Sequence, residues 1–419
     1  PVLTHWSTAA LAAELQGPHA AFYILTNSRS LTRQAACRLN REIGLNLKTA
    51  ARQAALPVEV ISRSDSTLRG HFPAEVEALA EAMEIGELPC LIGPCFFEGG
   101  RYTVNDIHYV AEGDQLVPAA QTPYAGDAAF GYRHSNLRDW VVEKSAGRVR
   151  RDAVATVSLA DLRRGGPDRV TGLLGALKPG SVCVVNAAQY SDLEVFVLGL
   201  LQARAQGHRF LYRTAASFVR VRCGQAAQRL LDTRDLAADN KNGGLFVVGS
   251  YVPKTSAQVA ALNAGGDIAA LEIDVRRLLQ KGQRDGEVSR VTAAMNGCIG
   301  AGEDVLLYTS RELVKGADAA HSLAIGRQVS ESLIRVVQGL AYQPRYLVAK
   351  GGITSSQVAT QGLGVQRAMI LGQVLPGVPV WRLGEESRYP NMAYIVFPGN
   401  VGDADALATI RDRLRPRQH

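Results

Sequence analysis

The sequence lacks the local signatures of several large protein classes. Its 419 residues include six cysteines, none in a Cys-x-x-Cys pair, and eight histidines without His-Glu-x-x-His spacing. No apolar run reaches the roughly 18 residues of a membrane span, and no charged segment precedes an apolar one at the start. A disulfide scaffold, a zinc site and a membrane-bound or exported chain are therefore poor interpretations. We expect a folded cytoplasmic protein with reduced, mostly buried thiols and no membrane partner.

Lysine is scarce as well, and charge of one sign does not dominate. The 46 basic side chains include eight lysines, which leaves 38 arginines, and 39 acidic side chains reduce the net charge to +7. This small excess does not predict nucleic-acid binding, because no basic run carries interleaved aromatic residues. Arginine suits carboxylate and phosphate groups, although a codon bias explains the composition equally well.

The pattern along the chain indicates an α/β protein of two domains. Strand-like and helix-like segments alternate almost throughout, which is typical of largely parallel sheets flanked by helices. In the first half, short buried strands are expected at 21–26 and 57–62, with a long helix at 31–56 between them. Further strands are expected at 89–93, 156–159, 181–186, 245–249, 267–273, 304–308, 346–349, 366–371 and 393–397, and a helix at 191–206. A polar segment near residue 240 predicts a boundary between domains 1–235 and 244–419.

Three glycine-rich turns in the second half share one design. Each follows an apolar strand and precedes a helix that we expect to be capped, at 249–256, 350–356 and 398–403. Glycine lets the backbone approach a ligand closely, and free N–H groups at a helix start attract anions. A single turn of this kind is more simply a structural turn with a Ser or Thr cap. Three of them in one domain favour nucleotide or phosphate binding.

These turns do not match the common nucleotide motifs. The turn at 249–255 lacks the glycine before lysine and the spacing of a Walker A loop. Gly-x-Gly-x-x-Gly before a helix and Gly-x-Ser-x-Gly are also absent, which argues against a standard dinucleotide fold and an α/β-hydrolase.

The first half carries one dense polar stretch, at 62–71, directly after an expected strand. Arginine forks there could take a carboxylate, while Asp65, Ser64 and Ser66 could take hydroxyl groups, so an anionic polyol is one expected ligand. The alternative is a hydroxyl-rich turn that caps the helix starting at Pro73, with solvated arginines.

A second loop, at 93–103, adds a weaker candidate. Arg101 follows paired glycines and could supply another anion contact, although a single arginine on a loop is usually a surface residue. We expect Cys95 to be a buried, inert thiol and not a nucleophile. His71 and His108 are expected to be packing or hydrogen-bonding residues.

At these loops the sequence resembles the four-carbon acid sugar kinases, which use ATP to phosphorylate tetronates such as threonate, erythronate or their 3-oxo forms. Asp-Ser-Thr-Leu-Arg-Gly at 65–70 matches the motif of the family's first domain, and Gly-Gly-Arg at 99–101 occupies the place of its second motif. The turns at 249–250, 351–355 and 399–402 match the nucleotide-domain loops in order and approximate spacing. The similarity covers nearly the whole chain.

The resemblance implies a sugar-acid-binding domain followed by a nucleotide-binding domain, with the site in a cleft between them. The substrate would meet Ser64, Asp65, Ser66, Arg69 and Arg101. The residues around ATP would be Ser250, Lys350, Gly351, Gly352, Ile353, Thr354, Gly399 and Asn400. Ile353 stands where the family commonly has an acidic residue, which removes one polar contact. Mg²⁺ is implied together with ATP, but no metal ligand is assigned.

The resemblance also leaves several points open. Family members open with an Asp-Asp-x-Thr-Gly-type segment that nothing here matches, so their start would precede Pro1. The catalytic base is therefore either Asp65 or a residue of that segment. Two rival functions are a sensor that binds without catalysis and a sugar-phosphate isomerase or lyase. A homo-oligomer is compatible with the sequence.

Overall fold

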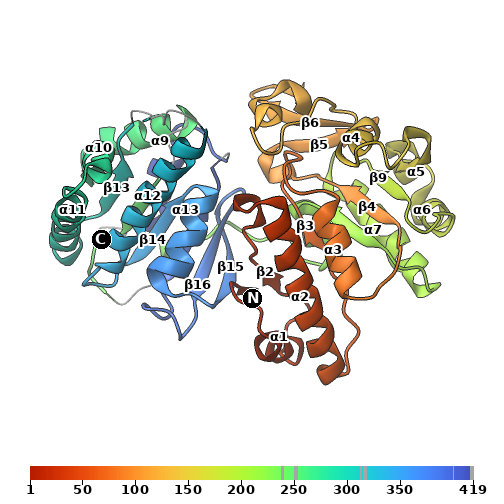
Figure 1. The fold of residues 1–419 in the computed structure, drawn as a ribbon, viewed down its shortest axis with the longest axis horizontal. Coiled ribbons are helices and arrows are strands. Elements are labelled where there is room, and N and C mark those ends of the chain that lie inside the picture. The colour runs from red at the N-terminus through yellow and green to blue at the C-terminus, as the bar shows by residue number, and fades with distance from the viewer. Residues whose placement is uncertain (237–239, 250–252, 312–313, 315–318, 400, 416–419) are drawn as a thin grey trace. The chain divides into compact units, whose positions relative to one another are not determined.

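The computed structural model describes residues 1–236, 240–249, 253–311, 314, 319–399 and 401–415 (Figure 1). Contacts divide the chain into two compact units. The N-terminal unit consists of Trp6–Ala21 and Thr26–Ala227, and the C-terminal unit of Pro1–His5, Phe22–Leu25 and Gln228–His419.

The N-terminal unit is built on a five-stranded sheet. Its order is β3 (Ser62–Arg63), β10 (Leu211–Thr214), β4 (Cys90–Gly93), β9 (Val182–Val185) and β8 (Val154–Val157), and all neighbouring strands are parallel. Its helices are α1 (Thr8–Leu15), α2 (Arg33–Ala54), α3 (Ala74–Ala82), α4 (Leu137–Lys144), α5 (Leu159–Arg163), α6 (Gly166–Gly175), α7 (Tyr190–Ala205) and α8 (Ala216–Arg222). β9 is an unbroken apolar run that is buried along its whole length, as expected for a parallel strand covered on both faces.

A small antiparallel sheet follows β4, where we expected a loop. It consists of β5 (Arg101–Val104), β6 (Ile107–Glu112) and β7 (Gln115–Pro118). Asn105 and Asp106 both have positive φ, 52° and 62°, which gives the tight turn that two-residue hairpins prefer. The loop expected at 93–103 is therefore wrong at its end, because residues 101–103 belong to a strand. Arg101 and Thr103 are buried in this strand, whereas Tyr102 between them is half-buried.

The C-terminal unit contains a nine-stranded mixed sheet. Its order is β12 (Ala269–Ile273), β13 (Val305–Thr309), β11 (Leu245–Val248), β14 (Tyr346–Lys350), β17 (Ala393–Phe397), β16 (Val378–Leu383), β15 (Arg367–Leu375), β1 (Val2–Leu3) and β2 (Tyr23–Ile24). The first five strands are parallel to one another, β16 runs antiparallel to β17, and β15 runs antiparallel to β16. The helices are α9 (Pro253–Ala264), α10 (Val275–Leu279), α11 (Arg284–Gly300), α12 (Ala319–Gln338), α13 (Gly352–Gln357) and α14 (Ala406–Leu414). The predicted α/β class is confirmed.

The start of the chain belongs to the sheet of the C-terminal unit. Val2 and Leu3 pair with Ala368 and Arg367 of β15, and only 3% and 1% of their surfaces are exposed. The two compact units are therefore not two consecutive parts of the chain divided near residue 240. The predicted boundaries 1–235 and 244–419, and the cleft between the two domains, stay predictions.

Most of the longer expected elements are observed within two or three residues. The helix expected at 31–56 is α2, and the strand expected at 393–397 is β17. The strand expected at 57–62 is wrong over most of its length, because pairing with β10 begins only at Ser62.

Candidate functional site

The site in the N-terminal unit is centred on the carboxylate of Asp65, in the loop directly after β3. Arg69 donates from Nε to Oδ2 of Asp65 at 2.9 Å, and Arg29 Nη1 lies 3.1 Å from Oδ1. The hydroxyl of Thr67 donates to Oδ2 as well. The carboxylate is thus held from both sides by arginine, as charge-assisted hydrogen bonds favour.

The surroundings keep Asp65 ionised. Burial by itself raises the pKa of this carboxyl, but the charges of Arg69 and Arg29 and the hydroxyl of Thr67 outweigh burial and lower the pKa to about 2. A carboxylate with so low a pKa is a weak proton acceptor and a good hydrogen-bond acceptor.

An aromatic ring lies beside two arginines of this site. The Arg69 guanidinium is 5.1 Å from the ring centre of Tyr124, and that of Arg101 is 5.8 Å from it. Arg101 donates from Nη2 to the Tyr124 hydroxyl at 3.4 Å, and Arg69 lies 3.5 Å from Asp127. The Arg101 side chain is buried, and its Nε has no partner among the described residues. A buried guanidinium that has no carboxylate partner among the described residues favours an anion as ligand.

The other predicted substrate residues lie in the same loop. Ser66 is buried, and its carbonyl oxygen lies 2.7 Å from Nε2 of His108, while the Ser64 amide donates to the Thr214 carbonyl at 2.7 Å. The structure therefore brings Ser64, Ser66 and Asp65 together. Their roles in substrate binding stay predictions.

Two neighbouring residues have structural roles, as expected. Cys95 is fully buried, and burial raises the pKa of its thiol to about 11. Burial likewise lowers the pKa of His108 to about 4, so its ring is neutral and bonds Thr103 and Ser66. The Cys95 thiol and the His108 ring are therefore both uncharged at neutral pH.

Sequence reasoning missed three residues of the site, Arg29, Tyr124 and Asp127. It also missed Arg213 of β10, whose Nη2 donates to the Arg69 carbonyl at 3.4 Å. Arg29 had a usable signal, because it lies in a polar run just after an expected strand, as the Asp65 loop does. Arg213 is a charged residue within a strand. Its burial can be predicted only once that strand is known to lie inside the sheet. Tyr124 and Asp127 lie in a turn-rich segment that carries no motif.

In the C-terminal unit, the three predicted loops come together at one sheet edge. β11, β14 and β17 are adjacent and parallel, so their carboxyl ends lie side by side. The Gly351 amide donates to the Phe397 carbonyl at 2.9 Å, which joins the second loop to the third. A Cβ atom on Gly249 would lie 2.6 Å from the Thr354 hydroxyl, so the first loop packs closely on the second. Ser250 and Asn400 lie outside the described residues.

Lys350 lies at the end of β14, between the second and third loops. Its Nζ donates to the Pro398 carbonyl at 2.9 Å and lies 3.9 Å from the ring centre of Phe397. The side chain is fully buried, and among the described residues no carboxylate lies within ion-pair distance of it. Burial, with a smaller effect of Lys254, lowers the pKa of this lysine to about 7. A nearby phosphate would favour the charged form.

The expected side-chain caps are wrong for two of the three helices. α13 begins after Gly351, which has no side chain, and Ser355 bonds back to the Ala349 carbonyl instead. α14 begins after Asp405, whose side chain makes no capping hydrogen bond. Gly352 and Ile353 open α13, and half of the Ile353 surface is exposed.

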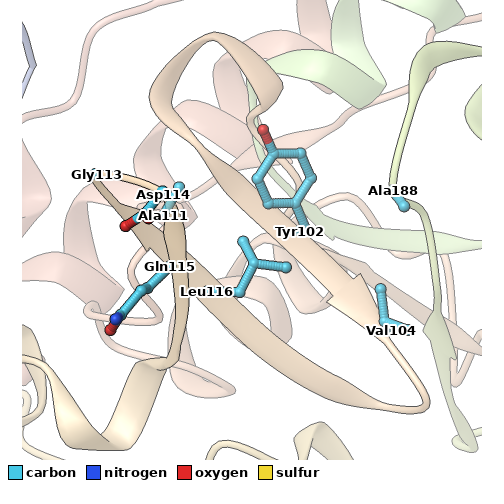
Figure 2. A pocket seen from close by; sticks show the side chains of 8 residues that line it. All are labelled: Tyr102, Val104, Ala111, Gly113, Asp114, Gln115, Leu116 and Ala188. Carbon is cyan, nitrogen blue, oxygen red and sulfur yellow. The ribbon is translucent and has the colours of Figure 1, made fainter.

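The small antiparallel sheet carries a shallow pocket of about 280 Å³ (Figure 2). The side chains of Tyr102, Val104 and Leu116 line it, with Asp114 and Gln115 at its rim. It contains none of the predicted substrate residues and has no basic side chain, so its chemistry differs from that of the Asp65 site.

The described residues show neither a ready metal site nor a membrane span. No group of three or more His, Cys, Asp or Glu side chains among them could hold a metal ion. No described helix is both long enough and apolar enough to cross a bilayer.

Comparison with known proteins identifies the kind of protein. Residues 3–222 match the family described as the sugar-binding N-terminal domain, and residues 245–407 match the nucleotide-binding C-terminal domain. The first match alone spans more than half of the chain, so the chain belongs to the proteins that join these two domains. These are the four-carbon acid sugar kinase family, and the resemblance seen in the sequence is confirmed.

The curated relatives agree with this assignment. The chain is 28% identical over 407 residues to a 3-oxo-tetronate kinase of Methylobacterium radiotolerans, covering 94% of this chain and 89% of the relative. It is 25% identical over 408 residues to a D-erythronate kinase of Heliobacterium modesticaldum, covering 93% and 86%. Both relatives are named as sugar-acid kinases, which are phosphotransferases with an alcohol group as acceptor.

Solved structures support the fold alone. A Haemophilus influenzae protein matches with a TM-score of 0.62 and 18% identity over 99% of both chains. A Salmonella typhimurium protein matches with a TM-score of 0.66 and 17% identity over 97% of both chains.

Proposed function

We propose that this chain is an ATP-dependent kinase that phosphorylates the terminal hydroxyl of a four-carbon sugar acid, a tetronate or a 3-oxo-tetronate. The observation that carries the proposal is the arginine cluster around Asp65 in the unit that matches a sugar-binding domain. The names of the relatives supply the chain length of the acid and the acceptor type.

The chemistry of the cluster fits a small hydroxylated carboxylate. Arg69 and the buried Arg101 are forks that match the geometry of a carboxylate. Asp65 stays ionised and accepts hydrogen bonds from substrate hydroxyls, and the hydroxyls of Ser64 and Ser66 add neutral partners. A neutral sugar would leave the excess positive charge of the site without a partner.

Nucleotide binding is assigned to the loops of the C-terminal unit. Lys350 is a buried cation beside the loops after β14 and β17, and it gains a partner when phosphate arrives. Gly351, Gly352, Ile353, Thr354 and Gly399, with Ser250 and Asn400 by resemblance, surround the triphosphate. Mg²⁺ commonly binds through phosphates and few protein ligands, which fits a protein whose described residues hold no ready metal cluster. When bound, it neutralises charge on the transferred phosphoryl group.

In this proposal the main role of Asp65 is to orient the attacking hydroxyl, and removal of the hydroxyl proton is its lesser role. Its pKa of about 2 makes it a weak base, and phosphoryl transfer depends mainly on positioning and on charge stabilisation. The hydroxyl proton is lost late in such a loose transition state, so a weak acceptor at hydrogen-bond distance suffices.

The test is incubation of the protein with MgATP and a panel of four-carbon sugar acids, with ADP release followed and the product identified by ³¹P NMR. ADP release that depends on one of the acids, with a phosphate ester on the terminal carbon, supports the proposal. Binding of acid or nucleotide without ADP release favours a sensor. Turnover of a sugar phosphate without nucleotide favours an isomerase or lyase.

A further inference from the structure

Arg213 is a buried charge with unusually few partners. It lies on β10, a strand between β3 and β4, and only 1% of its surface is exposed. Its guanidinium lies 4.7 Å from the ring centre of Trp140 and 5.7 Å from that of Phe72. Among the described residues no carboxylate lies within ion-pair distance of it, and its Nη1 has no hydrogen-bond partner. Contacts with aromatic rings compensate only part of the cost of burying such a charge.

Among the described residues, the one hydrogen bond of the Arg213 side chain goes to the candidate site. Its Nη2 donates to the Arg69 carbonyl at 3.4 Å. The backbone on both sides of Arg69 is in unusual conformations, since Leu68 has φ 68° and Gly70 has φ 126°. Such conformations persist where surrounding contacts fix them. The bond from Arg213 holds the carbonyl between these two residues, and the Arg69 side chain then reaches Asp65.

Arg213 stays charged inside the sheet. Burial lowers the pKa of Arg213 to about 10, so it stays protonated at neutral pH, and Asp65 is the acidic group that opposes this effect most. A hydrophobic side chain of similar length would fill the space between Trp140 and Phe72 at a smaller desolvation cost. Packing alone therefore does not explain an arginine at this position.

We propose that Arg213 is a positioning residue of the sugar-acid site, which fixes the Asp65–Arg69 loop through the Arg69 carbonyl and so holds the Arg69 guanidinium against Asp65. It acts on the substrate through Arg69 and Asp65 and does not touch it. The effect on turnover rests on the proposed function, whereas the effects on the loop and on Asp65 do not.

The test compares Arg213→Met, Arg213→Lys and a control, Arg150→Met, in the full chain. Arg150 is a surface residue of the same unit, with 79% of its side chain exposed. Three quantities are measured: the melting temperature, the pKa of the Asp65 carboxyl by ¹³C NMR, and the KM values for sugar acid and for ATP.

For Arg213→Met we expect an unchanged or higher melting temperature and an Asp65 pKa raised by roughly one unit. The KM for the sugar acid should rise about tenfold or more while the KM for ATP stays within about twofold. Arg213→Lys keeps a charged donor for the Arg69 carbonyl, so it should recover part of the Asp65 pKa and part of the KM, and Arg150→Met should change none of the three quantities.

Several results would overturn the proposal. An Arg213→Met protein that fails to fold would show that the arginine is needed for the fold, and equal rises of both KM values would show a general loss of structure. An unchanged Asp65 pKa in a folded variant would contradict the link from Arg213 through Arg69 to Asp65. If the wild-type protein phosphorylates no sugar acid, the proposed function fails, and the NMR and melting results still decide the role of Arg213 in the loop.

Discussion

At the scale of single residues, Asp65 combines burial with a strongly lowered pKa. Only 15% of its side chain is exposed, and its pKa falls from the usual 3.8 to about 2. A carboxyl whose pKa is lower in the folded state stabilises the fold above its usual pKa and loses that contribution as the pH falls through the folded value. The contribution of Asp65 is therefore complete above about pH 4 and lost towards pH 2.

The first prediction concerns Asp65→Asn, which leaves Arg29 and Arg69 without their carboxylate. Breaking a buried pair in this way should lower the free energy of unfolding at pH 7 by about 2–4 kcal/mol. Urea unfolding measures this loss, and the difference from wild type should shrink as the pH approaches 2. Asp152→Asn is the control, because Asp152 forms an exposed ion pair and should change stability by less than about 0.5 kcal/mol. Equal losses in both variants would contradict the description of the site.

Lys350 changes stability with pH in the same direction as Asp65, but in a higher pH range. Its pKa falls from 10.5 to about 7, so between these values the unfolded chain binds more protons than the folded one, and stability rises with pH. The second prediction is that Lys350→Met removes this rise. The KM for ATP should increase above about pH 7 in wild type, as Lys350 loses its proton, and should be higher and nearly constant with pH in the variant.

Unfolding curves and ATP kinetics between pH 6 and 10, at roughly half-unit steps, check the Lys350 prediction. Lys281→Met, which removes an exposed lysine of the same unit, is the matched control and should follow wild type. A wild-type KM for ATP that is constant with pH would show that Lys350 does not meet the phosphates.

At the scale of elements, the turn between β14 and α13 requires glycine at one position. Gly351 has φ 114°, a conformation that side chains rarely adopt. The third prediction is that Gly351→Ala lowers the free energy of unfolding by about 1–3 kcal/mol and weakens nucleotide binding, measured by calorimetry with ATP. Gly326→Ala should be neutral or stabilising by up to about 1 kcal/mol, because Gly326 lies on α12 with open space around it. Similar effects of the two changes would contradict the role given to this turn.

The elements also show how far sequence predicts this fold. β11 and β14 are continuous apolar runs that become fully buried parallel strands, and runs of this kind are recognisable from sequence. β1 is two residues long, and its partner β15 is far along the chain, so no local pattern predicts the pairing. The small sheet that contains β5 was not predicted because its strands are short. From sequence alone, Arg101 after paired glycines is more typical of a loop than of a strand.

The same reasoning applies to the candidate site. The Asp65–Arg69 loop was predictable because its functional side chains are contiguous. Arg29 and Arg213 reach Asp65 and Arg69 from other segments. The sheet order places β10, with Arg213, beside β3, and Arg29 comes from the segment after β2, so no local pattern predicts either contact.

At the scale of the whole molecule, the chain contributes to the C-terminal unit at both ends of the sequence. Leu3 is buried in that unit's sheet through its pairing with β15. The fourth prediction is that Leu3→Asp, which buries a charge there, reduces amide hydrogen-exchange protection in β15 and its neighbours. Protection of β4 and β9 should stay at the wild-type level. Loss of protection confined to β4 and β9 would contradict this assignment of the N-terminal segment.

In the proposed kinase, the sugar acid binds to one unit and the nucleotide to the other. The most direct measurement is a pair of KM values, for sugar acid and for ATP, determined for Arg69→Ala and Gly352→Val in the same ADP-release assay. Arg69→Ala should raise the KM for the sugar acid about tenfold or more with little change for ATP, and Gly352→Val should do the reverse. The opposite pattern would contradict the assignment, and so would equal changes in both constants for both variants.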